Sequence, residues 1–203
     1  MRMRTASLLL VVLLAGCAVG QKHDYVNPSV EVPIKSSTKL AVAVHDQRPY
    51  VVSGQKPPTF VGLQRGGWGN PFDVTTQSGA PLADDMQRTI VGALERSGNT
   101  VVGVTLSPTT SPADAKVTLL QADAMKFLLL TLHEWKSDQY ANTTFYCDVS
   151  LEILDSRGTV VETKRLSRQD EIGGGMSKST MPGAFRRTLE ELFWSGEIRQ
   201  ALR

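Results

Sequence analysis

Apolar residues are spaced in three ways along this chain, and each spacing predicts a different kind of element. An almost unbroken apolar run extends from Ala6 to Leu14. Further along, apolar and polar residues alternate, which is typical of strands that have one buried face. Two other segments carry apolar residues at three- and four-residue intervals, which is typical of amphipathic helices.

Alternation predicts strands in several places. The segment Lys39–His45 places Leu40, Val42 and Val44 on one side. From Phe145 to Ile153 every second residue is apolar, and Asp155–Gly158 predicts a turn into a returning strand over Thr159–Ser167. Weaker patterns predict strands over Thr100–Leu106 and within Ala113–Leu132, whereas His133–Asn142 is polar and predicts a loop.

Helical spacing predicts one helix over about Pro81–Ser97 and another that begins near Thr180. Proline suits the start of the first helix, and Gly98 suits its end. The second carries an apolar stripe and is followed by Gly196 and a short closing segment. The predicted fold class is α+β, with a mixed or antiparallel sheet of about four to five strands and two main helices packed on one face.

Two stretches lack a regular period. Residues 17–37 are polar and contain several prolines and serines, so we expect a flexible tether. Residues 46–80 are rich in Gly, Pro and aromatic residues and predict an extended loop. The expected domain organisation is a signal peptide over 1–16, the tether over 17–37, and a single α+β domain over 38–203.

The N-terminal apolar run has the layout of a secretory signal, because Arg2 and Arg4 precede it and small residues follow it. It is shorter than the roughly 20 apolar residues of a membrane-spanning helix. A signal with an incidental cysteine is the alternative. Leu14-Ala15-Gly16-Cys17 resembles the bacterial lipoprotein signal, which implies cleavage between Gly16 and Cys17 and lipidation and acylation of Cys17. An aspartate after the cysteine would favour retention in the inner membrane. Ala18 stands there instead, which implies that the protein lies in the outer membrane and faces the periplasm.

The charge of the chain argues against a nucleic-acid partner. There are 22 Lys and Arg residues against 20 Asp and Glu, and loss of Arg2 and Arg4 with the signal leaves 20 of each. A domain without net positive charge has no general attraction for a polyanion.

No sequence motif identifies an enzyme, a metal site or a cofactor site. The glycines before Lys178 lack the P-loop spacing, and the three histidines are far apart in the sequence. If Cys17 carries lipid, Cys147 has no disulfide partner, and its place in a strand predicts a small buried side chain. We therefore expect a protein that is not an enzyme, although catalytic groups that converge from distant loops remain an alternative.

Two groups of residues are candidate functional residues. Asp46 and Arg48 follow the first strand; they could contact a partner, but a structural role in fixing the start of the loop is favoured. Arg65, Trp68 and Phe72 lie in the predicted loop, where aromatic residues among glycines form adaptable contacts, so we predict partner binding there. The alternative is that Trp68 and Phe72 cap the sheet.

The lipoprotein signal, the segment Leu40–Arg48, the helix that ends at Ser97-Gly98 and the closing segment Glu197–Leu202 together resemble the YajG-type lipoproteins. This resemblance implies a small α/β lipoprotein of the bacterial envelope and supplies no catalytic residues. The expected function is that of a lipid-anchored accessory or binding domain whose partner is the membrane, through Cys17, and another envelope protein. The alternatives are a module that binds a lipid, glycan or peptide, and a hydrolase.

Overall fold

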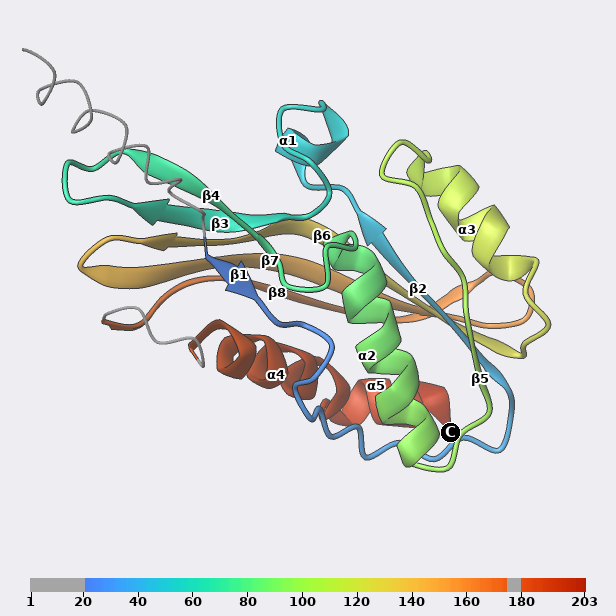
Figure 1. Cartoon of the computed structure of the whole chain (residues 1–203). Helices are drawn as coiled ribbons and strands as arrows, with labels where there is room; N and C mark the ends of the chain where they lie inside the picture. The colour runs from blue at the N-terminus through green and yellow to red at the C-terminus, as the bar shows by residue number, and fades with distance from the viewer. Residues whose placement is uncertain (1–20, 175–179) are drawn as a thin grey trace, which may run out of the picture.

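The computed structural model describes residues 21–174 and 180–203, and its centre is an eight-stranded mixed sheet (Figure 1). The α+β class is as predicted, but the sheet has more strands than the four to five expected. The strands are β1 (Lys22–His23), β2 (Leu40–Asp46), β3 (Phe60–Arg65), β4 (Pro71–Thr76), β5 (Val101–Gly103), β6 (Lys126–Gln139), β7 (Asn142–Leu154) and β8 (Val160–Gly174).

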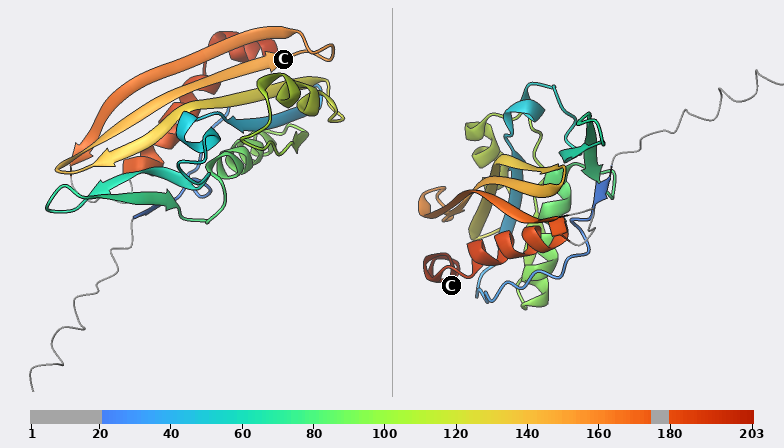
Figure 2. Two further views of the ribbon diagram at one scale, coloured as in Figure 1. Left: turned by 90° about the horizontal axis from the view of Figure 1, so that it is seen from above. Right: turned by 90° about the vertical axis from the view of Figure 1, so that its left-hand side faces the viewer.

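Three helices cover one face of the sheet and one covers part of the other (Figures 1 and 2). The helices are α1 (Pro49–Val52), α2 (Leu82–Arg96), α3 (Pro112–Leu120), α4 (Thr180–Phe193) and α5 (Gly196–Leu202). α2, α4 and α5 contribute to the main core, as expected of the two predicted helices, whereas α3 packs on the opposite face through Ala115 and Leu119.

The long strand β6 organises the sheet. Along one edge it pairs antiparallel with β7 over its whole length, and β7 pairs with β8. The other edge is shared: β2 pairs with Lys126–Leu132, and β3 pairs with Ser137–Gln139. The sheet therefore forks beside residues 133–136 of β6, between the end of β2 and the paired part of β3.

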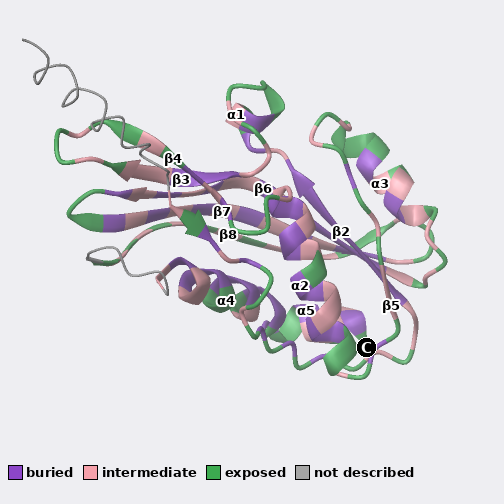
Figure 3. Ribbon diagram, viewed as in Figure 1, coloured by how far each residue is buried: buried purple, intermediate pink, exposed green. Residues whose placement is uncertain are grey.

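Burial follows the residue pattern that predicted the strands. All of β2 is buried, because Leu40, Val42 and Val44 face the main core while Ala41 and Ala43 face α3. In Figure 3 the buried colour follows β2, whereas the turn between β3 and β4 is exposed.

The prediction of a flexible tether is wrong for the described part of residues 17–37. Tyr25, Val30, Val32 and Ile34 are each at most 3% exposed and belong to the main core. The prolines and serines suggested a linker, but the apolar residues between them fill the surface between α2 and α4. The Tyr25 ring makes edge-to-face contacts with both Trp135 and Phe185.

The stretch predicted as an extended loop over 46–80 is structured. It contains α1 and an antiparallel hairpin formed by β3 and β4. Gly62 is necessary for the hairpin to approach β6, because a Cβ atom on it would lie 2.5 Å from the Ser137 carbonyl oxygen. The glycines that suggested irregular chain thus permit close pairing of strands.

Two further predictions on secondary structure are corrected. The segment His133–Asn142, expected to be a loop, belongs mostly to β6. The irregular pairing between Leu132 and Glu134 changes which residues are buried, from Leu130 and Leu132 before it to Trp135 and Ser137 after it. A bulge of this kind interrupts the period of two and conceals the strand. Part of the segment Ala113–Leu132, expected to be a strand, is instead helix α3, capped by Ser111.

Candidate functional site

Asp46 and Arg48 close the fork in the sheet. Arg48 is fully buried, and its guanidinium donates two hydrogen bonds to the Asp46 carboxylate, at 2.7 and 2.8 Å. The same group donates to the carbonyl oxygens of Phe60 at 2.6 Å and Trp135 at 3.2 Å. Burial works to lower the pKa of Arg48, but the Asp46 carboxylate outweighs it and raises the pKa.

This geometry fits the structural role favoured for the pair. The Trp135 carbonyl lies on the stretch of the β6 edge where neither β2 nor β3 pairs, and Arg48 supplies the missing donor. Tyr50 of α1 donates to the same carbonyl and to Glu134, at 3.2 and 2.6 Å. Asp46 and Arg48, here called the clamp, are each at most 1% exposed, and the guanidinium donors are occupied, so the clamp offers little to a ligand.

The three predicted partner-binding residues lie on one hairpin but in different environments. Arg65, at the end of β3, forms a bidentate ion pair with Asp138. Phe72 is half-buried on β4. Trp68, in the turn, is 96% exposed, so it does not cap the sheet. Trp68 is therefore the most accessible of the three for contact with another molecule.

Beyond α3, the second face of the sheet carries a row of paired charges, here called the polar face. It follows β6, β7 and β8 from the hairpin to α3, and its four ion pairs are Arg65–Asp138, Lys136–Glu134, Arg165–Asp148 and Lys116–Glu152. Arg65 and Arg165 hold the pKa of Asp138 and Asp148 below the ordinary value. Two of these pairs, Arg65–Asp138 and Arg165–Asp148, join neighbouring strands, and cross-strand pairs of this kind fix the side chains in place.

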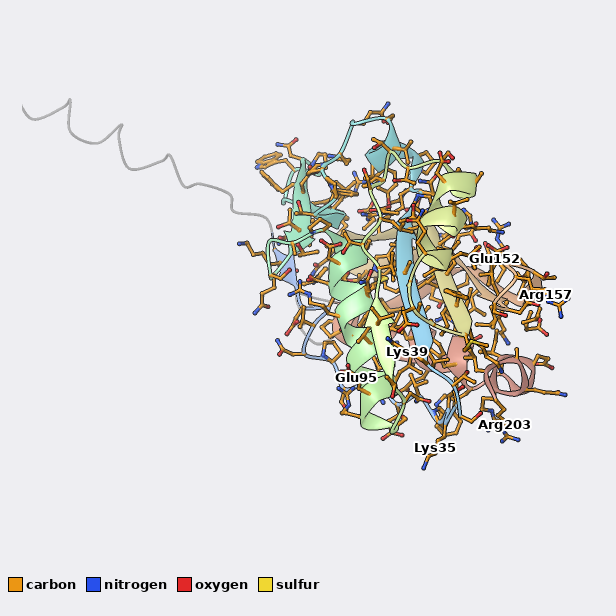
Figure 4. The ribbon with its side chains drawn as sticks, turned by 90° about the vertical axis from the view of Figure 1, so that its right-hand side faces the viewer. Lys35, Lys39, Glu95, Glu152, Arg157 and Arg203 are labelled. Atoms are coloured by element: carbon orange, nitrogen blue, oxygen red, sulfur yellow. The ribbon has the colours of Figure 1, made fainter. Side chains whose placement is uncertain are left out.

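At the α3 end of the polar face there is a cleft of about 440 Å³. Its floor is formed by β6, β7 and β8 and one wall by α3, where Lys116 reaches Glu152. Figure 4 shows Glu152 beside α3. His133 and Ser150 lie 2.9 Å apart in it, and Gln47 bridges His45 and the Pro108 carbonyl. Burial lowers the pKa of His45, so this ring is a neutral hydrogen-bonding group at pH 7.

The His133–Ser150 pair resembles the first two members of a hydrolytic triad but lacks the third. A triad needs a carboxylate that orients the imidazole. In residues 21–174 and 180–203 no carboxylate is hydrogen-bonded to His133, and the neighbouring Asp148 is bound by Arg165. A cross-strand hydrogen bond that positions polar groups in the cleft is the simpler reading.

The remaining predicted sites divide into those the structure describes and those it does not. Gly16 and Cys17 lie outside the described residues. Cys147 lies on β7 with its side chain buried in the main core. Burial raises the pKa of its thiol to about 12, which makes it a poor nucleophile. Within the described residues there is no cluster of three potential metal ligands. Nor does that part of the chain contain a helix with the length and apolar content needed to cross a bilayer.

Sequence reasoning missed the polar face and its cleft. Glu134, Lys136 and Asp138 fell in a segment predicted to be a loop, so no register could place them opposite β7. Asp148 and Ser150 were expected to point away from the core, and they do. Recognition of the bulge at His133 would have been needed to align the two strands.

Comparison with known proteins shows the fold and goes no further. No protein-family model and no curated protein matches the sequence. A crystal structure of a Xanthomonas campestris protein assigned to the family DUF330 is similar with a TM-score of 0.52, at 13% identity over 90% of this chain and 93% of that chain. The two proteins therefore share a fold.

Two other structures are less similar. PelC from Paraburkholderia phytofirmans, a dodecamer, has a TM-score of 0.39 at 14% identity, with 80% of this chain and 93% of that chain covered. Lipoprotein GNA1162 from Neisseria meningitidis has a TM-score of 0.33 at 15% identity, with 77% of this chain and 96% of that chain covered. The resemblance to YajG-type lipoproteins stays a prediction.

Proposed function

We propose that this chain is a lipid-anchored lipoprotein of the bacterial cell envelope, related to the YajG type, whose domain binds another envelope component and catalyses no reaction. Its anchor is Cys17, in the outer membrane on the periplasmic side. The lipoprotein signal Leu14–Cys17 supports the anchor. The observation that supports binding is the polar face, which leaves side chains of three long strands open to solvent.

The polar face suits a protein partner for two reasons. Its ion pairs are bidentate in two cases, at Arg65 and Arg165, so the side chains are already ordered before a partner arrives. Its charges alternate in sign, which favours a partner with a complementary pattern over a uniformly charged polymer. Trp68 lies beyond the end of this face, on the hairpin turn, and is not part of the surface proposed for the partner.

The cleft supports a second candidate function, the binding of a small polar ligand such as a glycan or peptide. Polar groups of Thr131, His133 and Ser150 converge in it beside Leu129, and its volume lies within the range of ligand sites. Because the cleft is part of the polar face, one experiment can distinguish the two candidates.

The test is affinity capture of the lipidated protein from envelope extracts. We expect one stoichiometric partner that is lost when Lys136→Glu and Arg165→Glu reverse two charges of the polar face. Lys39→Glu is the matched control, because Lys39 also forms an exposed ion pair, with Asp123, but lies at the end of the molecule away from the hairpin (Figure 4).

The outcomes separate the proposals. A partner that is still captured by the protein with Lys136→Glu and Arg165→Glu would show that the polar face is not the contact surface. A defined small molecule that co-purifies without a protein, and is lost with Ser150→Ala, would favour the ligand-binding module.

A further inference from the structure

Trp68 is the most exposed large apolar residue described, and its position is fixed by the hairpin turn. The Gly66 amide donates to the Asn70 carbonyl at 2.9 Å, and the Gly69 amide donates to the Gly66 carbonyl at 2.8 Å. Gly69 has a φ of 80°, which glycine adopts without strain. The turn therefore holds an indole that is 96% exposed at a defined end of the molecule.

The chain enters the fold from the same end. β1 pairs parallel with β4, with Lys22 opposite Thr75. Because the strands are parallel, the side from which β1 begins is the side where β4 begins, and β4 begins at the hairpin turn. Cys17 precedes Lys22 by five residues, which span at most about 18 Å.

The hairpin reaches about as far as this connection. The strand from Thr75 back to Pro71 covers about 14 Å, and Trp68 lies beyond it in the turn. Cys17 can therefore lie no farther than about 18 Å from Lys22. The hairpin turn lies at a comparable distance from Lys22, on the side from which β1 begins. The segment 22–34 does not lengthen this connection, because Tyr25 and its apolar neighbours pack in the core.

A second exposed aromatic residue lies at this end. Tyr140, in the turn between β6 and β7, is 59% exposed. The parallel pairing of Gln64 with Gln139 places Tyr140 level with Arg65, next to the hairpin turn. Figure 1 shows both turns at the end of the sheet opposite α3 and the C-terminus. Tryptophan and tyrosine are the residues that favour the boundary between lipid and water.

We infer that, in the lipidated protein, Trp68 and Tyr140 lie in the headgroup layer of the bilayer that holds Cys17. The occupant of the hairpin tip is the phospholipid surface and not a protein. This inference rests on the proposed lipid anchor. A single indole binds a bilayer weakly, so the contact orients the domain, with the hairpin end toward the membrane, and the lipid supplies the attachment.

The test uses fluorescence quenching by lipid. Lipidated protein is reconstituted in vesicles of phosphatidylethanolamine and phosphatidylglycerol. A fraction of the lipid molecules carries bromine in the acyl chains, close to the headgroup. Trp135 is fully buried and should not be quenched. We expect quenching that is lost with Trp68→Phe and retained with Trp194→Phe. Trp194 is the matched control: it is 51% exposed, and it lies at the end of α4, where its indole donates to the Glu31 carbonyl.

Vesicle flotation is measured on the same samples and separates the two proposals. Protein that floats but shows the same lipid-dependent quenching with and without Trp68 overturns the membrane contact and leaves the anchor intact. Protein that carries no lipid and does not float overturns both. A photoreactive residue placed at position 68 in cells should label lipid; a single protein adduct would contradict the inference.

Discussion

At the scale of the residue, Arg48 shows how one side chain resolves a problem of backbone pairing. β6 is longer than either neighbour on its second edge, and the carbonyl between the two neighbours needs a donor. The guanidinium provides several donors in a rigid plane, which suits two carbonyls and a carboxylate at once. A lysine could not make this set of contacts.

Replacement of Arg48 should therefore be severe. We expect Arg48→Ala to lower the free energy of unfolding by about 3–5 kcal/mol, because it leaves Asp46 buried without its partner. Arg165→Ala, which breaks a pair whose arginine is 59% exposed, should lower the free energy of unfolding far less. Urea unfolding of both variants measures the difference. Equal losses of unfolding free energy would contradict a structural role for Arg48 at the fork.

His23 should make stability depend on pH. Burial lowers the pKa of His23 from 6.5 to about 4. Between these values the unfolded chain binds more protons than the folded chain, so the free energy of unfolding should fall as pH falls from 6.5 toward 4, by up to about 3 kcal/mol. An NMR titration of the His23 ring, assigned with His23→Gln, should give a midpoint near pH 4; a midpoint near 6.5 would refute burial of His23.

At the scale of the element, prediction from sequence succeeded where one period continued and failed where two signals competed. The helix at Leu82–Arg96 and the strand at Asn142–Leu154 followed their apolar patterns closely. The second half of β6 was not predicted, because the bulge beside His133 reverses the alternation of apolar and polar residues. The segment 22–34 was assigned to a linker on the basis of its prolines, although four of its residues fill the core.

The packed N-terminal segment gives a direct test at this scale. Tyr25→Ala should cost about 3–5 kcal/mol, as expected for loss of a fully buried aromatic ring. Val26→Ala changes the next residue, which is 37% exposed, and should cost within about 0.5 kcal/mol. Chemical denaturation distinguishes them. If Tyr25→Ala is as stable as wild type, the segment is a tether after all.

At the scale of the whole molecule, the functional surfaces follow from the topology. β1 runs parallel to β4, so it begins on the side from which β4 leaves the hairpin turn, while the polar face extends along the sheet toward α3. Of the candidate site, sequence predicted the clamp residues and the exposed tryptophan. It could not align Asp138 with Arg65, because that contact depends on pairing between β3 and β6, which are far apart in the sequence.

Attachment through lipid on Cys17 can be tested by the distribution of Cys17→Ser between cell fractions. Among the described residues the core begins at Tyr25, so we expect the variant to fold, with the circular dichroism spectrum of the wild-type domain. We expect Cys17→Ser to appear in the soluble periplasmic fraction while the wild type sediments with membranes. Retention of Cys17→Ser in the membrane fraction after a high-salt wash would contradict it.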